Sequence, residues 1–361
     1  MNIGIPKESR PSEYRVGLHP AGVKMLISRG NTCYIEHDAG LHSGFTDQDY
    51  EKVGGTIVYS AHEAFGRADL ILKFSRPLEN ELRMISPNAT LCGFLHLPAA
   101  NQTKIDFLLE NEITTIAYEQ IQEKDGSRPV LHMMSEIGGR LSAQISAHYL
   151  QNNSGGKGIL LGGSAGVPPA EVVIFGAGVF GHFAASAFLG MGAQVTVLDR
   201  DYKSLRKIQY DLPQLVTMFS NQANIERTTA YADVVIAAAG IPGELAPKII
   251  TREILKSMKS RALIMDISID QGGCAVTSRP TTHDNPIFVE EDVIHYCVPN
   301  ISSVIARTAT NAFFNVAVPY ILDLAEKDVD KAIQENTAIE KAVNTYKGKI
   351  VNLNRIIPQD K

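Results

Sequence analysis

The stretch VVIFGAGVFG at residues 172–181 decides the fold of this chain. Its first four residues form a short apolar run, which predicts a buried parallel strand. Glycines in G-x-G-x-x-G spacing follow at once, and the apolar residues 183–189 predict a helix after them. Gly176 permits a tight turn, Gly178 lets the backbone approach a pyrophosphate, and Gly181 lets the helix pack closely on the strand.

A second strand and an acidic residue complete this pattern. The run QVTVLD at residues 194–199 predicts the next strand, which ends at Asp199, where the ribose hydroxyls of a dinucleotide would lie. The predicted helix begins at Val179 and offers free N–H groups to the phosphates. The charge of Asp199 repels a 2′-phosphate and favours NAD over NADP, whereas Arg200 and Arg206 carry the opposite charge. A purely structural turn is disfavoured because strand, helix, strand and acid are in register.

The composition describes a soluble globular protein with two domains of ordinary size. The chain has 361 residues, of which 44% are hydrophobic and 20% are charged. Its net charge of −5 and the lack of a Lys/Arg cluster argue against a nucleic-acid partner. No apolar run reaches the roughly 18 residues that span a bilayer. Residues 1–8 are typical of a first strand and not of a signal peptide.

The cysteines indicate a reducing compartment. They are far apart in the sequence and lack the spacing of metal ligands: Cys33, Cys92, Cys274 and Cys297. We therefore expect reduced, buried thiols in a cytoplasmic protein, and no metal site.

Short strands and helices alternate through the first third of the chain, which predicts a parallel sheet covered on both faces. The candidate strands of this part are Asn2–Pro6, Thr32–Glu36, Thr56–Val58, Leu70–Lys73, Thr90–Phe94 and Thr114–Ala117. A long helix is predicted from Glu136 to Leu150. After the glycine pattern, the predicted strands are Asp233–Ala238, Leu263–Ile267 and Ile294–Val298.

We therefore expect an α/β protein with two doubly wound parallel-sheet (Rossmann-like) domains. The segment after Ala306 is helical and should pack back on the first domain, so the substrate domain is discontinuous, with residues 1–135 and 306–361. The NAD-binding domain, residues 136–305, is inserted into it. Ligands of such folds bind beyond the carboxyl ends of the strands, so polar residues there are candidates for chemistry.

Several polar residues follow predicted strands. Arg15 can grip a carboxylate by two parallel hydrogen bonds, and the alternative is an ordinary surface ion pair. His96 can exchange a proton near neutral pH, and the alternative is a core histidine bonded to the backbone. Lys73 either donates to a substrate oxygen or extends its stem from the strand end. Asp266 and Asp270 close another strand, and for Asp266 we favour a turn-stabilising acceptor.

The chain also resembles a known family. The segments that carry the resemblance include YRV at 14–16, FLHL at 94–97, AYE at 117–119, MSE at 134–136, DQGGC at 270–274 and SRPTT at 278–282. In this order they resemble the alanine dehydrogenases and the related nucleotide-binding subunit of the proton-pumping transhydrogenase. The resemblance implies an NAD-dependent oxidoreductase that reversibly deaminates L-alanine to pyruvate and ammonia. It also implies a homo-oligomer, either a dimer or a hexamer.

The same resemblance implies roles for individual residues. His96 would be the acid/base and Asp270 the second catalytic group, while the substrate would contact Arg15, Lys73 and Ser75. The residues expected to contact the cofactor are Ser135, Gly176, Gly178, Val179, Gly181, Asp199, Arg200, Ser220, Ala239 and Asn300.

The chain departs from the family around the expected substrate. The family pattern Lys-Val-Lys-Glu-Pro is here KFSRP at residues 73–77, and Ser75 is too short and uncharged to replace the second lysine. Arg76 could help only if the backbone turns, because neighbours on a strand point to opposite faces. The loop Ile301–Ala306 differs as well. The alternative is therefore a relative that acts on a different 2-oxo acid, amino acid or imine. A non-catalytic, transhydrogenase-like subunit is disfavoured because His96 and Asp270 are both present.

Overall fold

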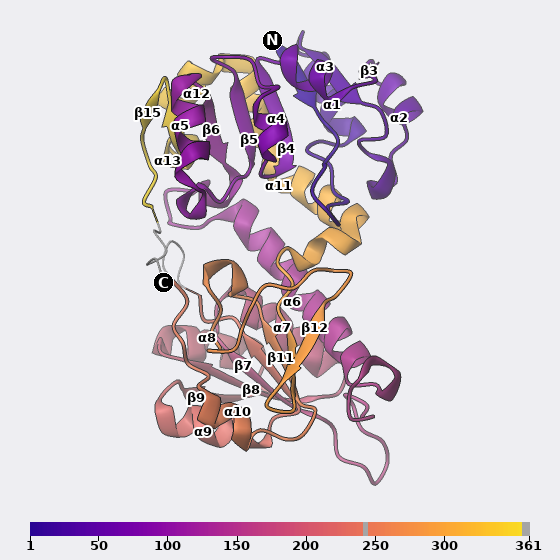
Figure 1. The fold of residues 1–361 in the computed structure, drawn as a ribbon, viewed down its shortest axis with the longest axis vertical. Helices are drawn as coiled ribbons and strands as arrows, with labels where there is room; N and C mark the ends of the chain where they lie inside the picture. The colour runs from indigo at the N-terminus through magenta and orange to yellow at the C-terminus, as the bar shows by residue number, and fades with distance from the viewer. Residues whose placement is uncertain (241–244, 356–361) are drawn as a thin grey trace. The chain divides into compact units, whose positions relative to one another are not determined.

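The computed structural model describes residues 1–240 and 245–355 (Figure 1). The chain forms two compact units. Unit 1 consists of Met1–Met134 and Ser302–Lys361, and unit 2 consists of Ser135–Ile301. The helix α6 (Pro129–Tyr149) contains the first boundary between them.

Unit 1 is built on an eight-stranded sheet with the order β15-β14-β6-β5-β4-β1-β2-β3. Neighbouring strands from β1 to β6 pair in parallel, whereas β14 pairs antiparallel with β6 and with β15. The strands are β1 (Asn2–Ile5), β2 (Thr32–Glu36), β3 (Thr56–Val58), β4 (Leu70–Ser75), β5 (Thr90–Phe94), β6 (Thr114–Ala117), β14 (Val343–Tyr346) and β15 (Lys349–Ile350). Every residue of β4, β5 and β6 is buried, as expected for central strands covered on both faces.

Most helices of unit 1 begin at a polar residue whose side chain caps them, whereas the helices that follow Leu78 and Ile305 have no such cap among the described residues. Asn101, for example, accepts the backbone N–H of Lys104 at 3.0 Å at the start of α5. The helices are α1 (Pro20–Ile27), α2 (Asp47–Glu51), α3 (Ala61–Gly66), α4 (Glu79–Leu82), α5 (Gln102–Glu110), α11 (Ala306–Lys327), α12 (Val329–Glu335) and α13 (Thr337–Ala342). Figure 1 shows α13 beside β6, and α5 contacts β14, so the C-terminal part of the chain is built into this layer.

Unit 2 is built on a seven-stranded sheet with the order β12-β13-β11-β10-β7-β8-β9. All pairs are parallel except β12 with β13. The strands are β7 (Glu171–Phe175), β8 (Gln194–Asp199), β9 (Val216–Phe219), β10 (Val234–Ala237), β11 (Leu263–Asp266), β12 (Ile287–Glu290) and β13 (Val293–Tyr296). Besides α6, its helices are α7 (Val179–Gly190), α8 (Tyr202–Asp211), α9 (Gln222–Tyr231) and α10 (Arg252–Ser257).

The predicted α/β class with two Rossmann-like sheets is confirmed. Both sheets are mixed, because antiparallel strands are added at their ends: β12 in unit 2, and β14 and β15 in unit 1. The helix α6 begins at Pro129, earlier than the predicted Glu136, since proline suits the first turn of a helix. None of the helices formed by described residues has both the length and the apolar character needed to cross a membrane.

Candidate functional site

The glycine turn of unit 2 uses each of its glycines for a different reason. Gly176 has a φ of +108°, and a Cβ there would lie 2.3 Å from the carbonyl oxygen of Ala238. A Cβ on Gly181 would lie only 1.8 Å from the carbonyl oxygen of Gly176, so this glycine lets α7 approach the end of β7. Around Gly178 a Cβ would meet no described atom within 4 Å, which leaves open space beside the backbone.

That open space lies at the start of α7. Gly178 is the N-cap residue, and no side chain among the described residues caps this helix. The first backbone N–H groups of α7 are therefore left without intrahelical partners, and the helix dipole favours negative charge there. The turn has the properties of an anion site at which the backbone can approach a phosphate closely.

Asp199 ties the glycine turn to the neighbouring strand. It ends β8, and its carboxylate accepts the backbone N–H of Ala177 at 2.6 Å and that of Asp201 at 2.8 Å. The carbonyl oxygen of Asp199 accepts the backbone N–H of Ser220, just after β9, at 2.9 Å. Since a carboxylate offers about four acceptor positions, Asp199 keeps capacity for the hydroxyls of a ribose.

Other predicted residues of unit 2 follow the carboxyl ends of its strands. Because the strands are parallel, these ends share one edge of the sheet. Asp270 is exposed in a single 3₁₀ turn after β11, and Asn300 is exposed with a φ of +54° after β13. Ala239 is half-buried after β10, and Arg200 is exposed directly after β8. Ser135 is the exception, since it lies half-buried on α6 and follows no strand.

Asp266, at the end of β11, has a structural role. Its buried carboxylate accepts backbone N–H groups from Ser268, Cys274 and Ala275, and the Ser278 hydroxyl at 2.5 Å. The prediction of a turn-stabilising acceptor is confirmed. The effect is to fix the loop that carries Asp270.

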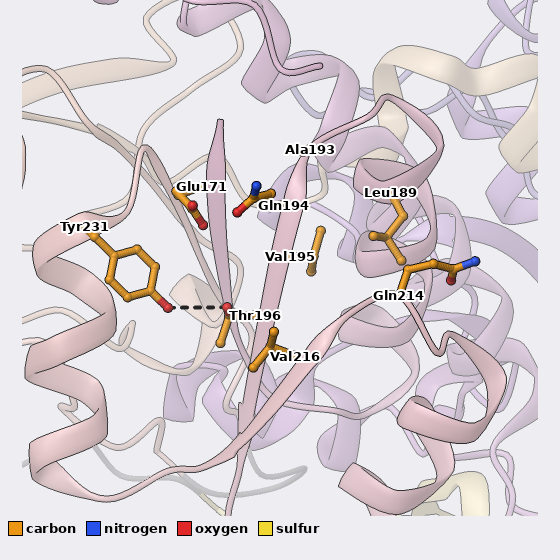
Figure 2. Close-up of a pocket in the computed structure, with 9 residues that line it drawn as sticks. All are labelled: Glu171, Leu189, Ala193, Gln194, Val195, Thr196, Gln214, Val216 and Tyr231. Atoms are coloured by element: carbon orange, nitrogen blue, oxygen red, sulfur yellow. Dashed lines mark hydrogen bonds between the residues drawn. The ribbon is translucent and has the colours of Figure 1, made fainter. Parts of the chain in front are cut away.

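A pocket lies at the other edge of the same sheet (Figure 2). Its volume is about 570 Å³, and its lining includes Glu171, Gln194 and Val216, the first residues of β7, β8 and β9. Figure 2 shows the hydroxyls of Tyr231 and Thr196 facing each other across 3.3 Å. None of the predicted site residues lines this pocket. It is therefore separate from the glycine turn, which lies at the carboxyl edge.

In unit 1, Arg15 is buried and already paired. Its Nε and Nη2 donate to the two carboxylate oxygens of Glu13 at 2.6 and 2.5 Å, and Nη1 donates to the Ser302 hydroxyl at 2.9 Å. The guanidinium lies 4.0 Å above the ring of Phe74. Glu13 is a residue that the sequence analysis missed, although it is only two positions away.

Lys73 and Ser75 are buried on β4 and are held by acidic side chains. The Lys73 ammonium lies 2.8 Å from Glu81 and 3.2 Å from Glu8. The Ser75 hydroxyl donates to Glu8 at 2.6 Å, and the Phe74 N–H donates to the same carboxylate at 2.6 Å. Burial raises the pKa of Glu8 despite the nearby ammonium. For Lys73, burial acts to lower the pKa, but both carboxylates outweigh it and leave the pKa raised.

His96 follows β5 in the left-handed conformation, with a φ of +47°. Its backbone N–H donates to Glu119 at 2.7 Å, and its Nδ1 lies 3.9 Å from the same oxygen. The imidazole is 37% exposed, whereas Oε2 of Glu119 is buried without a hydrogen-bond partner among the described residues. Such an uncommon backbone conformation for a histidine, beside an under-used carboxylate, is typical of functional sites.

Aromatic rings connect these groups within unit 1. The ring of Phe74, beneath Arg15, stacks on Phe94 with centroids 5.3 Å apart, and Phe94 lies 6.5 Å from the His96 ring. The structure thus brings Arg15, Lys73, Ser75 and His96 to the carboxyl ends of β1, β4 and β5. Asp270 belongs to the other unit.

The sheet order, the glycine turn and the acid at the end of β8 define unit 2 as a dinucleotide-binding domain of the Rossmann class. Two family models match the chain: "Alanine dehydrogenase/PNT, N-terminal domain" over residues 4–138 and "Alanine dehydrogenase/PNT, C-terminal domain" over residues 142–353. The chain belongs to the alanine dehydrogenase/PNT family.

Individual proteins agree with this membership. The chain is 42% identical to the alanine dehydrogenase of Mycolicibacterium smegmatis, over 98% of this chain and 95% of the relative. It is 44% identical to that of Methanococcus maripaludis, over 97% of this chain and 94% of the relative. A solved L-alanine dehydrogenase superposes with a TM-score of 0.92 at 38% identity and 97% coverage of both chains. A transhydrogenase from Sinorhizobium meliloti superposes with a TM-score of 0.83 at 26% identity, over 97% of this chain and all of the other.

The close contact at Gly181 predicts a strong stability effect. We expect Gly181→Ala to lower the free energy of unfolding by about 3 kcal/mol, because the added Cβ overlaps the carbonyl of Gly176. Gly190→Ala, in the same helix, is the matched control, since a Cβ there meets no described atom within 4 Å. Urea unfolding measures both. Equal effects of the two substitutions would contradict this packing.

Lys104 on α5 predicts a pH-dependent stability effect. Burial, then the charges of Arg76 and Arg10, lower its pKa from 10.5 to about 8. Between pH 8 and 10.5 the unfolded state binds more protons at this lysine than the folded state. The destabilisation that the buried lysine causes is therefore complete below pH 8 and decreases as the pH rises. We expect Lys104→Met to raise the free energy of unfolding by about 1–3 kcal/mol at pH 7, and by clearly less at pH 10.

The control for this experiment is Lys24→Met, because Lys24 is exposed on α1. Its effect should stay within about 0.5 kcal/mol at both pH values. If Lys104→Met raised the free energy of unfolding equally at pH 7 and pH 10, the charge of Lys104 would not be what destabilises the folded protein.

Proposed function

We propose that this chain is an NAD-dependent amino-acid dehydrogenase that interconverts L-alanine with pyruvate and ammonia. The observation that carries the proposal is the identity of 42–44% over nearly the whole chain to proteins named alanine dehydrogenase. The glycine turn of unit 2 and the His96–Glu119 pair of unit 1 supply the two kinds of group that such a reaction needs.

The cofactor site is formed by unit 2. The open space at Gly178 fits a pyrophosphate, and the uncapped N–H groups from Val179 onward would hold it. Asp199 would accept the ribose hydroxyls, with Ser220 on the adenine side and Asn300 towards the nicotinamide. When bound, NAD supplies a hydride acceptor. Close approach at Gly176 and Gly181 keeps the turn in the shape that admits the phosphates.

Proton transfer is assigned to unit 1. The substrate ammonium must lose a proton before hydride can leave Cα, and His96 is exposed enough to accept it. Glu119 holds the backbone of His96 and places its carboxylate 3.9 Å from the imidazole Nδ1. Asp270 would place the water that attacks the imine. Hydrolysis of the imine then gives the 2-oxo acid and ammonia.

Arg15 would bind the substrate carboxylate. Its guanidinium has five N–H donors, of which three are held by oxygens of Glu13 and Ser302. Nη1 also donates to Met134 Sδ at 3.6 Å. The N–H that remains for a carboxylate is oriented by these contacts and by the ring of Phe74. Lys73 and Ser75 would influence the substrate indirectly, through Glu8. Both are buried, and both are bonded to this carboxylate.

A second candidate is a family member that acts on another 2-oxo acid or amino acid. Ser75 favours it, because this residue replaces a lysine of the family pattern and its hydroxyl is occupied by Glu8. In either case the substrate is a small molecule. We also propose a cytoplasmic homo-oligomer, and the compartment is supported by the four cysteines, which are free and buried.

The direct test of the proposal is NADH formation from NAD and L-alanine, followed at 340 nm with a panel of other L-amino acids. We expect turnover with L-alanine or with a close relative of it. Absence of NADH with every amino acid, from protein that binds NADH, would refute the proposal.

His96→Ala should separate chemistry from binding. Loss of the proton acceptor should lower kcat by about 10²–10⁴-fold, while the Kd for NADH, measured by fluorescence, stays unchanged because the cofactor binds in unit 2. His62→Ala is the control, since His62 is exposed on α3. Normal kcat in His96→Ala would remove this residue from the mechanism.

Gly178→Ala should separate binding from folding. A Cβ at this position meets no described atom, so the variant should lose less than about 1 kcal/mol of stability as an N-cap change. The Cβ occupies the space of the pyrophosphate, so the Kd for NADH should rise at least tenfold. An unchanged Kd would place the phosphates elsewhere.

A further inference from the structure

The inner layer of the substrate edge in unit 1 does not attract an anion. Its buried charges are two cations, Lys73 and Arg15, against three carboxylates, Glu8, Glu13 and Glu81. Both cations are in ion pairs with these carboxylates. The formal charge of this layer is therefore negative. Arg15 is assigned to the carboxylate on Cα of the substrate, so a second anionic group needs positive charge from another source.

A second group of charges supplies it: Arg10, Arg76 and Lys104, which we call the cationic triad. Arg10 lies in the loop after β1, Arg76 follows β4, and Lys104 is on α5, which comes after β5 and His96. β1, β4 and β5 are neighbours in the sheet, so these residues gather at the carboxyl edge that also holds Arg15 and His96.

Members of the cationic triad lie within range of one another. The Lys104 ammonium donates to the carbonyl oxygen of Pro77 at 2.8 Å, which fixes it beside Arg76. Burial and then the charge of Arg76 lower the pKa of Arg10, although Glu13, Glu8 and Glu81 act to raise it. Burial and the charges of Arg76 and Arg10 likewise lower the pKa of Lys104. None of the three forms an ion pair with a described residue, although all are partly buried.

The local backbone explains how Arg76 reaches this position. The pairing of β4 with β5 shifts register between Leu72 and Ser75, and the strand ends at Ser75. Arg76 is therefore outside the regular strand. The rule that neighbouring side chains of a strand point to opposite faces does not apply to it. The positive charge that the family pattern carries at position 75 is here carried at position 76.

We propose that the cationic triad is an anion subsite that binds a second acidic group of the substrate, the one borne by its side chain. The substrate class is then an L-amino acid with an acidic side chain, and the corresponding dicarboxylic 2-oxo acid. This inference rests on the proposed function and deepens its second candidate. Glu8, Glu13 and Glu81 offset the charge of Arg10 only in part, since its pKa is still lowered. Like charges that are partly buried repel one another, and a bound carboxylate relieves that repulsion.

The experiment compares substrates that differ only in the acidic group. The kcat/KM for NADH formation is measured for L-aspartate against L-2-aminobutyrate and for L-glutamate against L-norvaline. We expect one acidic substrate to exceed its neutral counterpart at least tenfold. In Arg76→Gln this ratio should fall towards 1, in Lys104→Met it should fall less, and in Arg76→Lys it should largely persist.

Arg83→Gln is the matched control, since Arg83 is exposed at the end of α4 and forms no ion pair with a described residue. It should leave every ratio unchanged. A second readout needs no turnover: succinate and glutarate, but not butyrate, should raise the Tm of the wild type, and Arg76→Gln should abolish that rise.

The outcomes separate the two proposals. Turnover of L-alanine with no preference for acidic substrates, and no Tm rise with a dicarboxylate, would refute the anion subsite and leave the proposed function standing. A Tm rise that depends on Arg76, in a protein that forms no NADH from any amino acid, would refute the proposed function and support the subsite. Equal loss in Arg76→Gln and Arg83→Gln would also refute the subsite.

Discussion

The approach of α7 to the end of β7 is the contact on which unit 2 depends. Only glycine at position 181 lets the helix come within reach of the Gly176 carbonyl, and only glycine at position 176 fits beneath the carbonyl of Ala238. The helix start is thereby fixed at Gly178 with its N–H groups free. Asp199 bonds to the same turn from β8. A single packing constraint thus shapes both parts of the proposed cofactor site, the helix start for the phosphates and Asp199 for the ribose.

Unit 1 is organised by buried carboxylates. Glu8 holds Lys73 and Ser75, and Glu13 holds Arg15, so groups that would otherwise approach the substrate are fixed in an inner layer. Removing a partner from such a buried pair leaves an uncompensated charge, which is strongly destabilising. The layer therefore constrains what can change at this edge. A new specificity is more easily built from partly buried residues outside it, such as Arg76 and Lys104.

The sequence was most informative where function depends on neighbours along the chain. The glycine turn and Asp199 lie within 28 residues, and strands such as Thr32–Glu36 and Thr90–Phe94 were predicted at their observed bounds. Pairs between distant segments could not be predicted, because Glu8 meets Ser75, and His96 meets Glu119, only after the strands align. The antiparallel β14 and β15 were missed because they are short and follow a helical segment. Their place depends on pairing with β6.

In the proposed reaction, hydride passes from Cα of an amino acid to a nicotinamide held at the glycine turn. The most direct measurement uses L-alanine deuterated at Cα with unlabelled NAD, followed by NMR of the nicotinamide product. We expect deuterium at C4 of the reduced ring, in proportion to the pyruvate formed. Pyruvate formed with unlabelled NADH, or with the deuterium released to water, would contradict it.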